Sequence, residues 1–240
     1  MSATKLHFKA KSVGAAKVRF YGRMGPLGED EKQRVAYHLG KNLGATSFCS
    51  ILPANEEHPE AWYKVVDFEP GESKHAEAVV LKQPGQCCIF TSRDCPIVTI
   101  SDMTSGLVGA AHVGWRSLRK PTSDCPSCDA GVIENLMAAM GHPYGENLVV
   151  YVTGGISAKH LVLERELLEP FWQKFGHDVS PDPEHRTLDL FRVIRRICVR
   201  YGVRKDRILS DGICTFETEW AGSKRANREG SNWTYVIKYW

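Results

Sequence analysis

The chain has 240 residues, of which 42% are hydrophobic and 25% are charged, and its formal net charge is +3. This composition is that of a globular protein with a substantial core, in one large domain or two small ones. The weak charge, without a basic tract, gives no support for nucleic-acid binding. No apolar run reaches the length of a membrane span, and the first residues lack the core of a signal peptide. We therefore expect no membrane partner and a cytoplasmic location.

Strand and helix signals follow each other irregularly along the chain. Apolar and β-branched runs predict strands, in chain order, at residues 17–21, 62–68, 78–81, 87–92, 147–153 and 233–239. Helical patterns, most of them closed by a glycine, occur at residues 29–42, 129–140, 158–175 and 188–201. Regular βαβ alternation is absent. We therefore expect an α+β fold, a layered sandwich of mixed or antiparallel β-sheet flanked by helices, as a single domain over residues 1–240.

Two apolar runs, residues 95–101 and 107–112, are separated by a short polar segment that ends in Gly106. This pattern predicts a β-hairpin. Folding about residues 103 and 104 would place Cys95 opposite His112, with Cβ atoms about 4.5–5.5 Å apart. A thiol beside an imidazole suits either a metal site or a cysteine nucleophile with a histidine base. The plain alternative is a cysteine that only fills core.

A metal site at this hairpin would need a further ligand. Catalytic zinc usually takes three protein side chains and leaves one position for water or substrate. His38 falls in a predicted helix, His58 lies in a polar loop, and His75 precedes a predicted strand. Loops carried by a rigid sheet often supply binding residues. Spacing alone does not choose between His58 and His75.

Several segments resemble signatures of the laccase-domain family. Residues 92–98 (SRDCPIV) and 109–116 (GAAHVGWR) are similar to its two specific motifs around a cysteine and a histidine. Weaker similarity occurs at residues 18–25, 211–216 (DGICTF) and 223–225 (SKR). This family is also called multicopper polyphenol oxidase, peptidoglycan editing factor and, more recently, zinc-dependent purine nucleoside phosphorylase. The resemblance runs in family order from about residue 17 to the end of the chain.

The resemblance implies a zinc ion held by His58, Cys95 and His112, with His75 a lower-ranked third ligand. The segment at residues 56–59 (EEHP) lacks the Gln and Gly of the family's Gln-x-His-Gly motif. The implied reaction is phosphorolysis of a purine nucleoside such as inosine, adenosine or methylthioadenosine, with adenosine deamination as an added activity. The implied partners are therefore a nucleoside and phosphate, and the oligomeric state stays open.

The chemistry of such a site is coherent. Zinc with an open position lowers the pKa of bound water to about 7. Phosphate needs a cationic anchor, for which arginine is well shaped, and Arg23, Arg116 and Arg225 are candidates, with surface ion pairs as the alternative. Asp94 is a candidate acid, base or orienting residue beside Cys95, and its alternative is a turn residue at the strand end.

Other functions remain open at this stage. A copper-dependent polyphenol oxidase would need many histidine ligands, and the nine histidines include no His-x-His pair. Metal-free hydrolase chemistry at Cys95 and His112 and a peptidoglycan-editing role are further alternatives. Cys125 and Cys128 form a Cys-x-x-Cys pair that we interpret as a loop insertion, with a redox or metal role as the lesser option.

Overall fold

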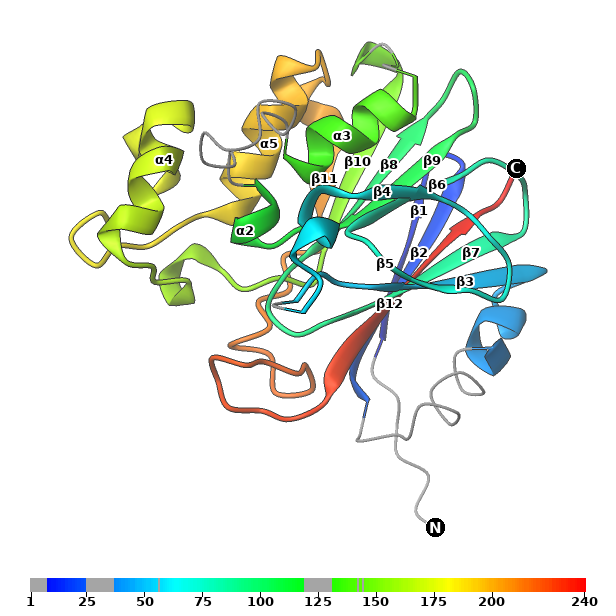
Figure 1. Ribbon diagram of the computed structural model, residues 1–240, viewed down its shortest axis with the longest axis horizontal. Helices are drawn as coiled ribbons and strands as arrows, with labels where there is room; N and C mark the ends of the chain where they lie inside the picture. Colours follow the sequence, from blue (N-terminus) through cyan, green and yellow to red (C-terminus); the bar gives the residue numbers. More distant parts are fainter. Residues whose placement is uncertain (1–7, 25–36, 56, 119–130, 142, 144) are drawn as a thin grey trace.

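The computed structural model describes residues 8–24, 37–55, 57–118, 131–141, 143 and 145–240. Two six-stranded sheets form its body (Figure 1). The first sheet has, in spatial order, β1 (Phe8–Val13), β2 (Ala16–Met24), β12 (Ser231–Lys238), β7 (Gln86–Ser92), β3 (Ser47–Leu52) and β5 (Ser73–His75). The second has β11 (Ile208–Ser210), β10 (Leu148–Thr153), β8 (Ile97–Asp102), β9 (Val108–His112), β6 (Ala78–Leu81) and β4 (Val65–Asp67). Each sheet mixes parallel and antiparallel pairs.

Helices cover the second sheet. They are α2 (Trp115–Leu118), α3 (Val132–Ala139), α4 (Arg165–Phe175) and α5 (Leu190–Arg200). Figure 1 shows α3, α4 and α5 gathered on one side of the sheets, while the helical segment at residues 37–42 lies at the other. Short 3-10 turns are η1 (Pro59–Tyr63), η3 (Gly145–Asn147), η4 (Ala158–His160), η5 (His177–Val179) and η6 (Lys205–Arg207). Of the helices that the structure describes, none is long and apolar enough to cross a bilayer.

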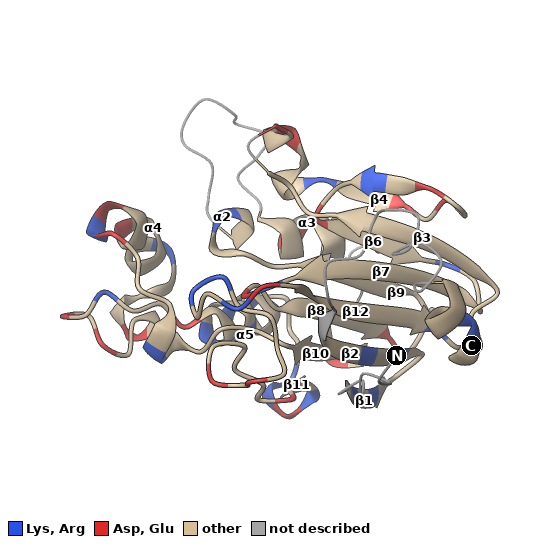
Figure 2. Ribbon diagram, turned by 90° about the horizontal axis from the view of Figure 1, so that it is seen from below, with Lys and Arg blue, Asp and Glu red and all other residues tan. Residues whose placement is uncertain are grey.

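The hydrophobic core consists of three layers. Ile100 belongs to the layer between the second sheet and α3, α4 and α5. Ile97 and Phe90 meet in the layer between the two sheets. Tyr235 lies in a smaller layer on the outer face of the first sheet, against Leu39 of the helical segment. The central strands are nearly free of charged residues, which lie mainly on helices and loops (Figure 2). Burial of apolar side chains on both faces of the sheets therefore holds the layers together.

This architecture confirms the expected α+β sandwich of mixed sheets. The strand at residues 87–92 also forms as predicted, and its alternation places Cys88 between the sheets and Cys87 on the outer layer. Desolvation raises the pKa of both thiols well above the ordinary value. Both cysteines therefore fill core.

Two predicted elements are partly wrong. The helix expected at residues 158–175 is interrupted, because Leu161 accepts a backbone hydrogen bond from Leu188 and Leu163 donates one to Arg186. Only η4 and α4 remain of it. The strand expected at residues 62–68 begins late, because Pro59 opens the 3-10 turn η1 and leaves β4 just three residues.

The predicted hairpin exists, but its register differs from the prediction. Ile97, not Cys95, is the partner of His112. The Asp102 carboxylate accepts the Thr104 amide, and Gly106 adopts a φ of +69°, so the turn centres one residue later than expected. Continuing the same register beyond the strands, where Val113 donates its amide to Pro96, places Cys95 opposite Gly114.

Candidate functional site

Cys95 and His112 meet despite the shifted register. His112 is the last residue of β9, and Cys95 lies two residues before β8. The two side chains lie close enough to interact, since Cys95 raises the pKa of His112. Gly114 leaves the space beside the thiol open, since a Cβ added there would lie 3.2 Å from Cys95 Sγ. Cys95 and His112 are both partly exposed, whereas Pro96 and Val113 beside them are buried.

Glu77 is the buried acid that orients His112. Its Oε2 contacts His112 Nδ1, and its side chain is only 3% exposed. Burial of the ring lowers the pKa of His112. The charges of Glu77 and Cys95, together with hydrogen bonding, raise this pKa by more than burial lowers it. The pKa of His112 therefore lies well above its ordinary value. Because Glu77 occupies Nδ1, Nε2 is the nitrogen left to bind a ligand, an arrangement common in metal sites. We call Cys95, His112 and Glu77 the strand-end site.

Glu77 also brings the loop of His58 to this site. Its Oε1 accepts the Ala54 amide at 3.1 Å, and Asn55 in turn accepts the His58 amide at 2.9 Å. The His58 ring lies against the His75 ring, with their centroids 3.8 Å apart. His75 Nδ1 is buried and has no hydrogen-bond partner among the described residues. Both candidate third ligands therefore lie side by side, and the structure does not choose between them.

The strand-end site has the donor chemistry of a zinc centre. It offers a thiol, an imidazole held through Nδ1 by a carboxylate, and a nearby buried imidazole nitrogen that has no partner in the described part of the chain. Within the described part of the chain, however, the ligand atoms of His58, Cys95 and His112 do not all lie within 4.8 Å of one another. Cys95 and His112 interact, and no third described side chain joins them in a group with that spacing.

Asp94 is fully engaged with a distant loop. Its Oδ1 accepts hydrogen bonds from Ser223 Oγ at 2.6 Å and Thr215 Oγ1 at 3.1 Å. Its Oδ2 accepts the Arg225 amide at 3.1 Å, and its backbone oxygen accepts the Ile156 amide. Asp94 thus ties the loop at residues 214–225 to the segment that carries Cys95. These contacts favour a positioning role over proton transfer.

The three candidate arginines are placed differently. The guanidinium of Arg116 lies over two indole rings, 4.9 Å from the Trp115 centroid and 5.5 Å from that of Trp62. It forms no ion pair with a carboxylate in the described chain, so the surface salt bridge considered as its alternative is absent there. Arg225 has an exposed side chain and contacts Asp94 through its backbone. Arg23 lies in β2, but its side chain is outside the described residues, as are Cys125 and Cys128.

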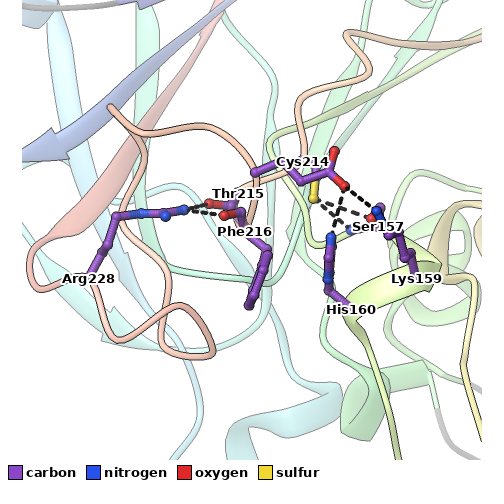
Figure 3. Close-up of polar contacts among 8 residues, drawn as sticks. Ser157, Lys159, His160, Cys214, Thr215, Phe216 and Arg228 are labelled. Carbon is purple, nitrogen blue, oxygen red and sulfur yellow. Dashed lines mark hydrogen bonds and ion pairs between the residues drawn. The ribbon is translucent and has the colours of Figure 1, made fainter.

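A second group of metal-ligand side chains occurs where the sequence did not predict one. One ligand atom from each of His160, Cys214 and Glu217 lies within 4.8 Å of the other two (Figure 3). Cys214 also lines a cavity of about 450 Å³ that is bordered by Pro96. Burial raises the pKa of the Asp211 carboxyl in the same wall. We call His160, Cys214 and Glu217 the loop site. The three-residue spacing of Cys214 and Glu217 was its only local signal, since His160 is distant in sequence.

The fold and the strand-end site define a class of proteins that combine two mixed sheets with a cysteine–histidine pair beside the ends of two strands. The family described as multi-copper polyphenol oxidoreductase laccase matches residues 21–237 of this chain. The chain therefore belongs to that family, as the resemblance had implied.

Curated relatives carry another name. The chain is 26% identical over 173 residues to a purine nucleoside phosphorylase of Pseudomonas aeruginosa, and the match covers 69% of the chain. It is 26% identical over 149 residues, 62% of its length, to the purine nucleoside phosphorylase YfiH of Escherichia coli. These matches span 66% and 57% of the two relatives. The names indicate an enzyme family, while the activity of this chain stays a proposal.

Solved structures share the fold. A Neisseria meningitidis protein superposes with a TM-score of 0.76 at 18% identity, and the match covers 97% of this chain and 99% of that one. The hypothetical protein YfiH of Bacillus licheniformis gives a TM-score of 0.70 at 13% identity, with 92% of both chains covered. These solved structures therefore support the two-sheet architecture.

Proposed function

We propose that this protein is a zinc-dependent purine nucleoside phosphorylase whose centre is the strand-end site. The observation that carries the proposal is the chain of contacts from Glu77 through His112 to Cys95. The names of the curated relatives support the same reaction. Phosphorolysis breaks the bond between the purine nitrogen and the anomeric carbon and joins that carbon to a phosphate oxygen, so inosine and phosphate yield hypoxanthine and ribose 1-phosphate.

The residues of the strand-end site fit zinc as the resident metal. Cys95 and His112 would hold it, together with His58 or His75, and Glu77 would fix the orientation of His112. When bound, zinc supplies a Lewis acid with one position open to water or an anion. The mixed sulfur and nitrogen donors favour zinc over magnesium or calcium.

The other residues around the site would position the two substrates. The Arg116 guanidinium lies over Trp62 and Trp115, and it has no carboxylate partner among the described residues. A guanidinium in this state is free to form two hydrogen bonds with one phosphate. The Tyr63 hydroxyl donates to the Arg116 carbonyl and holds α2 against η1. Asp94 keeps the segment before Cys95 tied to the loop at residues 214–225.

The test is a nucleoside assay with and without phosphate. The zinc-loaded protein is incubated with inosine, adenosine or 5′-methylthioadenosine, and the products are separated by chromatography, with metal content measured on the same samples. We expect release of the free base only when phosphate is present. Base release that is equal without phosphate, or no release from any of the three nucleosides, would contradict the proposal.

The same samples distinguish the alternatives. Inosine formed from adenosine would establish the deaminase activity that the family resemblance implies. Base release that persists after chelation, in protein with no measurable metal, would favour metal-free chemistry at Cys95 and His112. Oxygen uptake with a phenol in the copper-loaded protein, without any phosphorolysis, would favour the polyphenol oxidase that the family description names.

A further inference from the structure

The loop site lies on two segments that are far apart in the sequence. His160 ends the short turn η4, while Cys214 and Glu217 belong to the loop that follows β11. Gly155 and Cys214 pair as an isolated parallel bridge, which brings these segments together. The amides of Glu217 and Thr218 donate to the Cys214 carbonyl at 3.2 and 2.9 Å, so the loop turns immediately after the cysteine. This turn places Cys214 and Glu217 on the same side.

The ligand atoms of the three side chains lie within 4.8 Å of one another, and Figure 3 shows Cys214 and His160 near each other. His160 Nε2 lies 2.8 Å from Glu217 Oε1. The His160 ring stacks on Phe216 with centroids 3.9 Å apart and an angle of 16° between the planes, so its direction is fixed. Cys214 Sγ accepts the Ser157 amide at 3.4 Å and lies 3.3 Å from Ser157 Oγ. These two contacts with Ser157 fix the position of the sulfur.

An ordinary ion pair explains only part of this arrangement. It accounts for His160 and Glu217, and for Lys159 Nζ, which lies 3.6 Å from the same carboxylate oxygen. It does not account for the buried sulfur that faces both groups. The Lys159 side chain is 77% exposed, so it can leave the carboxylate without disturbing the fold.

We propose that His160, Cys214 and Glu217 form a second metal site, for zinc or a divalent cation of similar donor preference. Sulfur, nitrogen and carboxylate oxygen are the three donor types that zinc takes in proteins. Cation binding would release the proton of the Cys214 thiol to water and would replace the direct contact between His160 and Glu217. Water would complete the coordination, because the Glu217 side chain is 51% exposed.

The position of this site suggests a structural role. Thr215, next to Cys214, donates to Asp94, which precedes Cys95. A cation at the loop site would join η4 to the loop at residues 214–217, at the wall of the 450 Å³ cavity. It would therefore hold the partners of Asp94 in place without taking part in the reaction. This inference does not depend on the proposed phosphorolysis.

Cobalt is the probe for the test, because a cobalt–thiolate bond gives a charge-transfer absorption band. The background protein carries Cys95→Ala, Cys125→Ser and Cys128→Ser, which removes the strand-end thiol and the Cys-x-x-Cys pair as sources of that band. Titration with Co²⁺ should give the band with one equivalent bound. Adding Cys214→Ser should abolish it, and adding Glu217→Gln should weaken binding more than about tenfold, since even orienting partners of metal ligands contribute about 10–100-fold.

Glu219→Gln is the matched control, because Glu219 is an exposed carboxylate two residues away that does not belong to the loop site. It should leave the cobalt affinity unchanged. If the background protein does not fold, the same comparison is made with Cys95 intact, where Cys214→Ser should lower the bound cobalt by one equivalent. A missing band in the folded background protein, or binding that Cys214→Ser leaves unchanged, would overturn the proposal.

Discussion

The strand-end site and the loop site offer similar donors on different scaffolds. His112 ends a strand whose register is fixed by pairing with β6 and β8, and its acid partner is 3% exposed. The loop site is held by side-chain contacts between two turns, and its carboxylate is 51% exposed. A rigid, buried scaffold suits catalysis, because the geometry must be set before substrate arrives. A half-exposed site between loops is better suited to reversible binding of a structural ion.

Removal of the strand-end thiol should have the largest effect on activity. We expect Cys95→Ala to lower kcat/KM for phosphorolysis by about 10³-fold or more, as is typical when a central catalytic group is lost. Steady-state assays on metal-loaded protein would measure this loss. The control is Cys49→Ala, because burial raises the pKa of that thiol to about 12 and leaves it inert. An active Cys95→Ala protein would remove the strand-end site from the mechanism.

The acid behind His112 should matter next. We expect Glu77→Gln to lower zinc affinity and kcat/KM by about 10–100-fold, because the glutamine keeps the shape but loses the charge that orients the ring. Zinc competition titrations and kinetics would measure both effects. Glu72→Gln, which alters an exposed carboxylate beside Lys74, is the control. Equal losses in both variants would argue against a specific role for Glu77.

The same pair predicts how stability depends on pH in the metal-free protein. The pKa of His112 is raised above 6.5 in the folded state. Its stabilising contribution is therefore fully present just below pH 6.5 and is lost as the pH rises through the raised value. The difference in free energy of unfolding between wild type and Glu77→Gln should be largest near pH 6 and should shrink at higher pH. Urea denaturation across this range checks it, and a difference that grows with pH would contradict the assignment.

Arg116 is the residue of this region that we expect to bind phosphate. If it anchors phosphate, Arg116→Ala should raise the KM for phosphate about tenfold, which corresponds to about 1.4 kcal/mol. The KM for the nucleoside should change less. Arg204→Ala, which removes an exposed arginine paired with Asp206, is the matched control. An unchanged KM for phosphate would exclude Arg116 and leave Arg23 and Arg225 as candidates.

At the scaffold of the loop site, the expected effect is on the free energy of unfolding. The Arg228 guanidinium donates to the carbonyls of Ala221, Thr215 and Phe216. Because it bridges the loop, Arg228→Ala should lower the free energy of unfolding by about 2 kcal/mol, the scale of hydrogen bonds to a charged group. Chemical denaturation would measure this change. An unchanged stability would show that the loop is held by its other contacts.

Some of the fold could be predicted from the sequence because burial alone decides it. Alternation at Cys87 and Cys88 follows directly from a strand buried on both faces. Short strands such as β5 and β11 could not be predicted, because three residues carry too little pattern. The break before α4 depends on pairing between Leu161 and Leu188, which are far apart in the sequence.

The strand-end pair could be predicted from one local pattern, since Cys95 and His112 flank a single hairpin. Its register could not, because hydrogen bonds of Asp102 within the turn decide which residues oppose each other. Glu77 was missed because it lies 35 residues before His112 in the sequence, and only the fold brings the two side chains together. The loop site was missed for the same reason, since His160 and Cys214 meet only in the folded chain.

Anomalous diffraction at the zinc absorption edge, from crystals of zinc-loaded protein, would show directly whether Cys95 and His112 hold the metal. We predict one peak in contact with Cys95 Sγ and His112 Nε2, and a second, separate peak among His160, Cys214 and Glu217. A map without a peak at Cys95 and His112 would contradict the assignment of the strand-end site as the metal centre.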